Sequence, residues 1–350
     1  MRVLIWHVHG GWTDAFVRGA HDYLLPVDDE RGPWGLGRGG RDWPASAIEA
    51  PVGSLRDEDI DVVVLQRPAE IDLTEELTGR RPGLDLPAVF LEHNTPKPEA
   101  ATTRHPLADR RDIPIVHVTH FNQLYWDCGS APTIVIEHGI VDPGLRYTGE
   151  LERMAVVTNE PVRRGRIVGT DLLPAFLAAG GIDLFGIGVD GLPQAMAIDR
   201  ERLRPVGDLP PALLQTALPV RRVYLHLPRW TSLGLSLLEA MHLGMPVVAL
   251  QATEVSRAVP PGAGFVSTNL DELVLGARLL LEDPDTARGI GAAARDAALA
   301  RYGLDRFLRE WDTLLADVSD ATRRTGRRTA VTAPDRPEED GGPHAHRNGL

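Results

Sequence analysis

Residues 228–250 read PRWTSLGLSLLEAMHLGMPVVAL. Hydroxyl side chains and a glycine come first, an apolar stretch with a single glutamate follows, and Gly-x-Pro leads into a short β-branched run. This order predicts a helix that begins after Gly234 and is followed by a buried strand. A helix joined so closely to an apolar strand is the repeating unit of a parallel α/β sheet.

The same alternation extends along the chain in both directions from this stretch. Short apolar runs are separated by helical patterns, and continuous apolar strands of this kind predict parallel sheets that are covered on both faces. The runs are RVLIWHV (2–8), DVVVLQR (61–67), PAVFLEH (87–93), IPIVHVT (113–119), PTIVIEHG (132–139), MAVVTN (154–159), IDLFGIG (182–188), RRVYLHL (221–227), MPVVAL (245–250) and GFVS (264–267). They form two sets, so we expect an α/β protein with two doubly wound, Rossmann-like domains that face a central cleft.

The boundaries of these domains follow from breaks in the apolar pattern. Glycine, proline and charged residues interrupt it near 138–153, which predicts a first domain at 1–145 and a second at 146–316. Residues 270–316 have helical patterns, and it stays open whether the last helix packs back on the first domain. Residues 317–350 have little apolar surface to bury, which predicts a disordered tail.

Composition narrows the classes of function. Of the 350 residues, 43% are hydrophobic and 25% are charged, as in folded proteins. A net charge of -12 argues against nonspecific binding of nucleic acid. Cys128 is the single cysteine, which excludes an internal disulfide and favours a reducing compartment such as the cytoplasm. The sequence contains no run of about 18 apolar residues, so no transmembrane helix is expected.

Two weaker motifs do not predict a bound cofactor or metal ion. GLGRGG at 35–40 matches the dinucleotide pattern Gly-x-Gly-x-x-Gly, but it follows no strand and precedes no helix, so we interpret it as a loop. His7 with His9, and His117 with His120, could each offer two metal ligands. Because no carboxylate or cysteine cluster accompanies either pair, no metal is expected.

Groups that suit a phosphate follow two of the strands. In open α/β sheets, ligands bind beyond the carboxyl ends of the strands, where backbone amides and helix N-termini hold anions. Gly10 and Gly11 would let a ligand approach the backbone closely, although a plain tight turn explains them equally well. Arg163 and Arg164 precede Gly165 and a helix, where an arginine pair would neutralise a diphosphate, with solvated surface arginines as the alternative.

The opening stretch suggests a second phosphate contact. Thr231, Ser232, Leu233 and Gly234 lead into the expected helix, so hydroxyls and amides there suit phosphate oxygens. Glu239 lies one or two turns further along and would repel a phosphate placed beside it. We therefore expect its carboxylate to accept hydrogen bonds from hydroxyls, as ribose-binding carboxylates do.

Several stretches together resemble glycosyltransferase family 4, a group of retaining enzymes with the GT-B architecture. TSLGLSLLEAMHLGMPVVA (231–249) is similar to its donor-site signature, TIVIEHGIVDP (133–143) to the strand and linker that close its first domain, and HGGW (9–12) to its first glycine loop. The similarity covers about residues 1–316. It implies a metal-independent transferase that moves a sugar from a nucleotide-diphosphate donor, bound mainly by the second domain, to an acceptor held mainly by the first.

The resemblance also implies roles for single residues. Glu239 matches the glutamate that contacts the ribose, and Arg164 matches the basic residue that holds the diphosphate. His93, in FLEHNTP, stands where the family often has a histidine that faces the donor sugar.

Two positions depart from the family pattern and keep other functions open. Thr231 replaces the first of two glutamates, and Asn159 replaces an arginine for which Arg163 would substitute. These changes leave room for an altered donor or reduced activity. The alternatives are a GT-B enzyme that is not a transferase, such as a nucleotide-sugar epimerase or phosphorylase, and a degenerate GT-B scaffold.

No motif in the sequence identifies the acceptor. A cell-surface glycan, a glycolipid or another lipid-linked acceptor, and a small secondary metabolite all fit the resemblance. The loop KPEAATTRHPLADRRD (97–112) is rich in arginine, which leaves peripheral contact with a membrane open.

Overall fold

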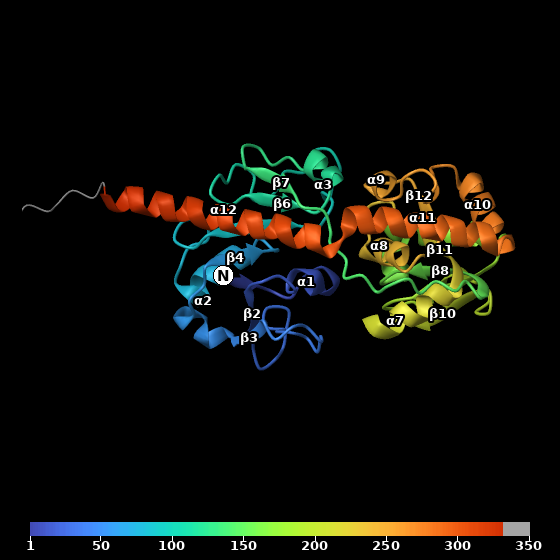
Figure 1. The fold of residues 1–350 in the computed structure, drawn as a ribbon, viewed down its shortest axis with the longest axis horizontal. Helices are drawn as coiled ribbons and strands as arrows, with labels where there is room; N and C mark the ends of the chain where they lie inside the picture. The colour runs from blue at the N-terminus through green and yellow to red at the C-terminus, as the bar shows by residue number, and fades with distance from the viewer. Residues whose placement is uncertain (332–350) are drawn as a thin grey trace, which may run out of the picture.

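The computed structural model describes residues 1–331, except for the side chains of Arg323 and of residues 325–331. Two parallel sheets lie side by side (Figure 1). The first sheet, in the order β3-β2-β1-β4-β5-β6-β7, contains β1 (Arg2–Ile5), β2 (Asp22–Val27), β3 (Ala47–Pro51), β4 (Val62–Leu65), β5 (Ala88–Glu92), β6 (Ile115–His117) and β7 (Thr133–Val135). The second sheet, in the order β10-β9-β8-β11-β12-β13, contains β8 (Leu151–Val157), β9 (Gly181–Phe185), β10 (Leu203–Gly207), β11 (Arg221–His226), β12 (Val247–Leu250) and β13 (Gly264–Ser267). The expected fold class is confirmed, and we call the parts of the chain around these sheets the first half and the second half.

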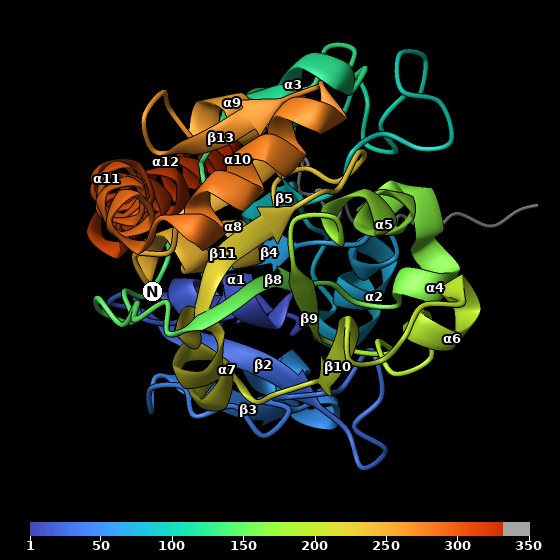
Figure 2. The same ribbon diagram turned by 90° about the vertical axis from the view of Figure 1, so that its right-hand side faces the viewer.

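Helices cover both faces of the second sheet. Figure 2 faces the second half and shows α11 on one side of its strands and α5 on the other. The helices are α1 (Gly10–Phe16), α2 (Glu70–Thr78), α3 (His120–Tyr125), α4 (Pro161–Arg164), α5 (Leu173–Phe176), α6 (Leu192–Met196), α7 (Pro211–Ala217), α8 (Leu235–His242), α9 (Val255–Ala258), α10 (Leu270–Glu282), α11 (Pro284–Tyr302) and α12 (Leu304–Val331).

The apolar runs form strands because both faces of each sheet are buried. In β1, Val3 and Ile5 belong to one core, whereas Leu4 and the following residue, Trp6, belong to the core on the opposite face. Successive side chains of a strand point to opposite faces, so a strand between two cores is apolar at every position. This is why the runs were readable from the sequence.

The last helix returns to the first half. α11 ends at Tyr302, Gly303 follows, and α12 runs back along the first sheet (Figure 1). Phe307 and Trp311 of α12 are buried in the core of the first half, and the ring centroids of Trp311 and Trp12 are 5.5 Å apart. Burying one phenylalanine side chain stabilises a fold by ~1.5–3 kcal/mol. α12 is therefore part of the packing of the first half.

Three strands and part of the last helix differ from the sequence interpretation. β2, β3 and β10 were not foreseen, and each contains a proline, while β3 and β10 are edge strands in which a proline is tolerated. The disordered tail predicted from residue 317 is wrong up to Val331, because α12 continues to that residue. Ser319 is buried and Val318 packs on the core of the first half, so the helix is held beyond the predicted boundary. The remainder of that prediction, 332–350, lies outside the described residues.

Candidate functional site

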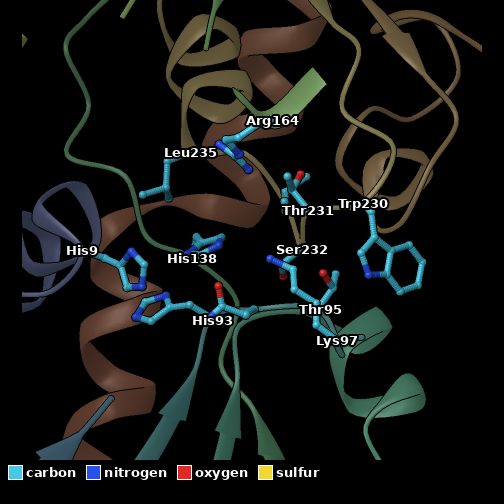
Figure 3. A pocket seen from close by; sticks show the side chains of 12 residues that line it. His9, His93, Thr95, Lys97, His138, Arg164, Trp230, Thr231, Ser232 and Leu235 are labelled. Atoms are coloured by element: carbon cyan, nitrogen blue, oxygen red, sulfur yellow. The ribbon is translucent and has the colours of Figure 1, made fainter. Parts of the chain in front are cut away.

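The two halves enclose a pocket at the carboxyl ends of their strands, which we call the central pocket (Figure 3). Its volume is about 170 Å³. The first half contributes His9, His93, Asn94, Thr95, Lys97 and His138. The second half contributes Arg164, Trp230, Thr231, Ser232, Leu233 and Leu235. The position is the one where open parallel sheets bind ligands.

A larger pocket, which we call the outer pocket, also lies between the halves and has a volume of about 500 Å³. Gly11, Asp14 and Arg41 line it from the first half, and Gln215 and Glu239 line it from the second. Residues from both sheets therefore surround each of the two pockets.

The start of α8 faces the central pocket, as the sequence predicted. Thr231, Ser232 and Leu233 line the pocket, and Gly234 is the residue before the helix, with no side-chain cap among the described residues. A Cβ atom added at Gly234 would lie 2.6 Å from Cε1 of His226, so a larger residue does not fit there. Uncapped amides of a first helical turn, next to hydroxyl side chains, suit an anion.

Hydrogen bonds hold this segment against the first half. The buried Oγ of Ser232 lies 3.1 Å from Oγ1 of Thr119. Trp230 donates from Nε1 to the carbonyl oxygen of Pro96 at 3.0 Å. The loop before α8 is thus positioned by residues that follow two strands of the opposite sheet.

Arg164 and Arg163 are adjacent but have different surroundings. The guanidinium of Arg164 is partly buried in the central pocket and has no hydrogen bond or ion pair with any described residue. Burial lowers its pKa, as does the positive charge of Arg163, while Glu160 acts in the opposite direction. Arg163 is exposed and donates from Nε to Oε1 of Glu160 at 3.0 Å. Of the two arginines, Arg164 is therefore the one whose charge is free to bind an anion.

The expected arrangement of Arg163 and Asn159 is not found. Both arginines end the short helix α4, and a 3-10 helix begins at Gly165 directly after them, but Arg163 does not line the central pocket. Asn159 is exposed, and its Oδ1 accepts a hydrogen bond from the backbone N–H of Ile187 at 3.0 Å. The side chain of Asn159 thus links the segments that follow β8 and β9, and it lies outside the lining of the central pocket.

Glu239 lies in the outer pocket and not in the central one. Its carboxylate is partly exposed and faces Asp14 and Arg41 of the first half. Burial raises the pKa of Glu239, the negative charge of Asp14 raises it further, and Arg41 lowers it. Leu235 lies between the two pockets, because it lines the central pocket and its Cδ1 would be 3.1 Å from a Cβ atom at Gly11, which lines the outer one. The start of α8 therefore lines the central pocket, and the middle of α8 lines the outer pocket.

Gly10 and Gly11 begin α1. The helix begins there because the backbone N–H of Thr13 donates to the carbonyl oxygen of His9 at 2.9 Å. A Cβ atom at Gly10 would lie 2.6 Å from a guanidinium nitrogen of Arg41. The two glycines thus allow close approach of side chains from an adjacent loop and from α8.

Three histidines meet in the central pocket, of which the sequence singled out His93 as a sugar contact. The ring centroids of His9 and His93 are 4.0 Å apart. Burial lowers the pKa of His93 well below its usual value, and the charges of His9 and His138 lower it further. Burial also lowers the pKa of His138, to about 3, with smaller effects of His9 and Arg306. These imidazoles are neutral near pH 7, so on this side of the pocket the positive charge comes from Lys97 and not from the histidines.

Sequence reasoning missed several residues of the two pockets. His138 lies shortly after β7, and this position after a strand is the signal that could have identified it. Lys97, Trp230, Asp14 and Arg41 stand on loops or on a helix, without any motif. The GLGRGG loop does reach the cleft, since Gly40 and Arg41 line the outer pocket.

The two histidine pairs considered as metal ligands have other contacts. Nδ1 of His7 lies 3.1 Å from the carbonyl oxygen of Gly37, and Nε2 of His117 lies 3.6 Å from Sγ of Cys128. Within residues 1–331, no group of three or more His, Cys, Asp or Glu side chains is arranged to hold a metal ion. Over the same range, no helix has the combined length and hydrophobicity of a membrane span.

Comparison with known proteins finds a family match within the second half. Residues 202–297 match the family described as Glycosyl transferases group 1. This segment includes α8 and therefore the start of the helix that lines the central pocket. No curated protein matches the sequence.

Solved structures share the fold at low sequence identity. Sucrose-phosphate synthase from Thermosynechococcus elongatus is 14% identical with a TM-score of 0.68, and the match covers 92% of this chain and 100% of that one. Anabaena HepE in complex with UDP is 14% identical with a TM-score of 0.65, over 91% and 100%. S. aureus TarM, in a complex that includes UDP, is 15% identical with a TM-score of 0.59, and the match covers 73% of this chain but only 55% of TarM. The chain has the GT-B fold with a glycosyl transferase group 1 segment.

Proposed function

We propose that the protein is a retaining, metal-independent glycosyltransferase that uses a nucleotide-diphosphate sugar. The observation that carries this proposal is the unpaired guanidinium of Arg164, which shares the central pocket with the hydroxyls and amides at the start of α8. A partly buried guanidinium without an internal partner favours binding of an anion, with which it forms charge-assisted hydrogen bonds. The UDP complexes of HepE and TarM support a nucleotide diphosphate as that anion.

The two pockets divide the donor between them. The diphosphate binds at the start of α8 beside Arg164, and the ribose hydroxyls donate to the carboxylate of Glu239 in the outer pocket. The transferred sugar lies in the central pocket against His93. This assignment follows the order of the residues along α8, from the hydroxyls at its start to Glu239 in its second turn.

Catalysis in this arrangement is mainly electrostatic. The bond from the anomeric carbon to the diphosphate oxygen breaks while the acceptor hydroxyl attacks from the same face, and its proton passes to the leaving phosphate. Negative charge grows on the diphosphate, where Arg164 and the amides of α8 are already oriented. A fixed cation and fixed dipoles supply this stabilisation without a divalent ion.

The acceptor enters from the first half. Lys97, the first residue of the arginine-rich loop 97–112, lines the central pocket opposite Trp230 of the second half. A glycan, a lipid-linked sugar and a small molecule all offer the hydroxyl that the reaction needs. The single cysteine supports a reducing compartment such as the cytoplasm as the place of action.

The test is the change in melting temperature on adding UDP, GDP, ADP, CMP or dTDP, with Mg²⁺ or with EDTA. A ligand that binds only the folded protein raises the melting temperature. We expect one nucleoside diphosphate to stabilise the wild type equally with EDTA, and Glu239→Gln to lose most of that shift. Glu282→Gln, an exposed substitution at the end of α10, is the matched control and should respond as the wild type does.

Three other results would each change the proposal. A shift that requires Mg²⁺ would refute metal independence, and no shift with any nucleotide would favour the scaffold hypothesis. Turnover of the nucleotide sugar to its epimer without release of nucleotide would favour an epimerase.

A further inference from the structure

Gln66 connects three adjacent strands of the first sheet at the edge of the central pocket. It follows β4, while Trp6 follows β1 and His93 follows β5, and these strands are neighbours in the order β1-β4-β5. Nε2 of Gln66 donates to the carbonyl oxygen of Trp6 at 2.7 Å. Its Oε1 lies 3.1 Å from Nε2 of His93. Gln66 is 7% exposed, so neither contact competes with bulk water.

The chemistry of these two contacts determines which nitrogen of His93 carries the hydrogen. A backbone carbonyl only accepts hydrogen bonds, so the amide nitrogen of Gln66 faces Trp6 and its amide oxygen faces His93. An amide oxygen also only accepts, so Nε2 of His93 must be the donor. The opposite orientation of the amide would place Oε1 of Gln66 against the carbonyl oxygen of Trp6, and two acceptors cannot form a hydrogen bond with each other.

The other ring nitrogen of His93 is then an acceptor. Burial lowers the pKa of His93, so the ring carries one hydrogen near neutral pH. Since that hydrogen is on Nε2, Nδ1 has a lone pair. Nδ1 has no hydrogen-bond partner among the described residues, although His93 lines the central pocket.

Gln66 itself is held in place by a further contact. Its backbone N–H donates to Oε2 of Glu70 at 2.6 Å, and Arg67 donates from Nε to Oε1 of the same carboxylate at 2.7 Å. Glu70 is fully buried at the start of α2. The orientation of Gln66 is therefore part of the packing of the first half and does not wait for a ligand.

We propose that Gln66 is a positioning residue that holds His93 in the tautomer with hydrogen on Nε2, so that Nδ1 accepts a hydrogen bond from a hydroxyl group of the ligand. The identification of that ligand as the donor sugar rests on the function proposed above, whereas the tautomer does not. In this proposal, Nδ1 of His93 accepts a hydrogen bond from a hydroxyl group of the ligand. His93 does not transfer a proton to the leaving group. A sugar that lacks the hydroxyl at this position would leave Nδ1 unpaired in a buried site and would be discriminated against.

The tautomer is measured by long-range ¹H–¹⁵N NMR of the full chain labelled with ¹⁵N-histidine at pH 7.5. The His93 signals are those lost in His93→Gln. We expect a protonated Nε2 and an unprotonated Nδ1 in the wild type. A protonated Nδ1, either alone or together with Nε2, would overturn the proposal, and this outcome is measured in the wild type, with His93→Gln used only to assign the signals.

A pair of glutamine variants tests whether Gln66 is responsible. Gln66→Met keeps the length of the side chain and removes both hydrogen bonds, so the single tautomer of His93 should be lost or become a mixture. Gln123→Met is the matched control, because Gln123 is also partly buried and donates to Oγ1 of Thr133 at 3.1 Å. It should leave the His93 signals unchanged. Unaltered His93 signals in a folded Gln66→Met protein would contradict a role of Gln66.

Titration with UDP-glucose and with UDP tests the contact with the sugar hydroxyl independently of the tautomer of His93. If the sugar hydroxyl donates to Nδ1, UDP-glucose moves the Nδ1 signal of His93 and UDP alone does not. UDP-glucose that raises the melting temperature but leaves Nδ1 unmoved would refute the hydroxyl contact. Failure of every nucleotide to bind would refute the proposed function instead, while the tautomer in the free protein would still be measured.

Discussion

The two sides of the central pocket differ in how their polar groups are satisfied. On the side of the first half, the imidazoles are neutral, and His93 is bonded to Gln66. On the side of the second half, Arg164 is a cation without a partner next to the uncapped start of α8. A neutral, internally bonded surface distinguishes hydroxyl groups, whereas an open cation attracts phosphate. In the proposed function, the second half therefore binds the diphosphate mainly through Arg164, and the histidines of the first half contact the sugar, with Lys97 as the cation on that side.

The largest expected effect comes from removing the open cation. Arg164→Met should lower turnover of the donor by ~100-fold or more, as loss of one electrostatic contact to a developing charge does. Arg163→Met is the matched control, because Arg163 lies in the same short helix but is exposed and paired with Glu160. It should stay within about twofold of the wild type, measured as nucleotide release at saturating donor. Equal losses in both variants would mean that the two arginines do not differ in function.

A smaller effect is expected from the carboxylate in the outer pocket. Glu239→Gln should weaken binding of the nucleoside diphosphate by about tenfold, the size of one lost hydrogen bond to a charged group. Isothermal titration calorimetry measures the change. An unchanged dissociation constant would contradict the ribose contact.

Glu239 also predicts the sign of a stability change without ligand. Because burial and Asp14 raise its pKa in the folded protein, ionisation at neutral pH disfavours the folded state. Glu239→Gln should therefore melt at a higher temperature than the wild type at pH 7.5, and this gain should shrink as the pH falls to the raised pKa. A variant that is less stable at pH 7.5 would show that the carboxylate has a stabilising partner.

The smallest expected effect is the change in the pH dependence of stability when His138 is replaced. The pKa of His138 falls to about 3 in the fold, so between pH 6.5 and 3 the unfolded chain binds a proton that the folded protein does not. Stability linked to His138 is thus fully present above pH 6.5 and is lost as the pH falls toward 3. In His138→Asn, the melting temperature should fall less between pH 7 and pH 5 than in the wild type. His120→Asn, at an exposed ring, should keep the wild-type slope.

The fold was predictable where burial leaves a strong pattern. β8 and β11 are apolar because both their faces are covered, whereas β2, β3 and β10 contain prolines that local propensity reads as breaks. The extension of α12 beyond residue 316 depends on contacts with the first half, a tertiary effect that composition does not report.

The site was predictable in part, for a related physical reason. His93 follows a strand end and the residues before α8 lie at a helix start, where topology alone places them in the cleft, whereas Arg164 is the last residue of α4. Gln66 became visible only through its two hydrogen bonds, and the difference between Arg163 and Arg164 only through the position of Glu160. Sequence indicates which residues can bind a phosphate, but packing decides which of them stays unpaired.

The proposed placement of the diphosphate in the central pocket and of the ribose in the outer pocket is tested most directly by a crystal structure of the protein with UDP, grown in the presence of EDTA. The account predicts that the diphosphate lies against Arg164 and the amides at the start of α8, with the ribose hydroxyls on Glu239. A diphosphate bound away from Arg164, or one held through a metal ion in a second crystal grown with Mg²⁺, would contradict it.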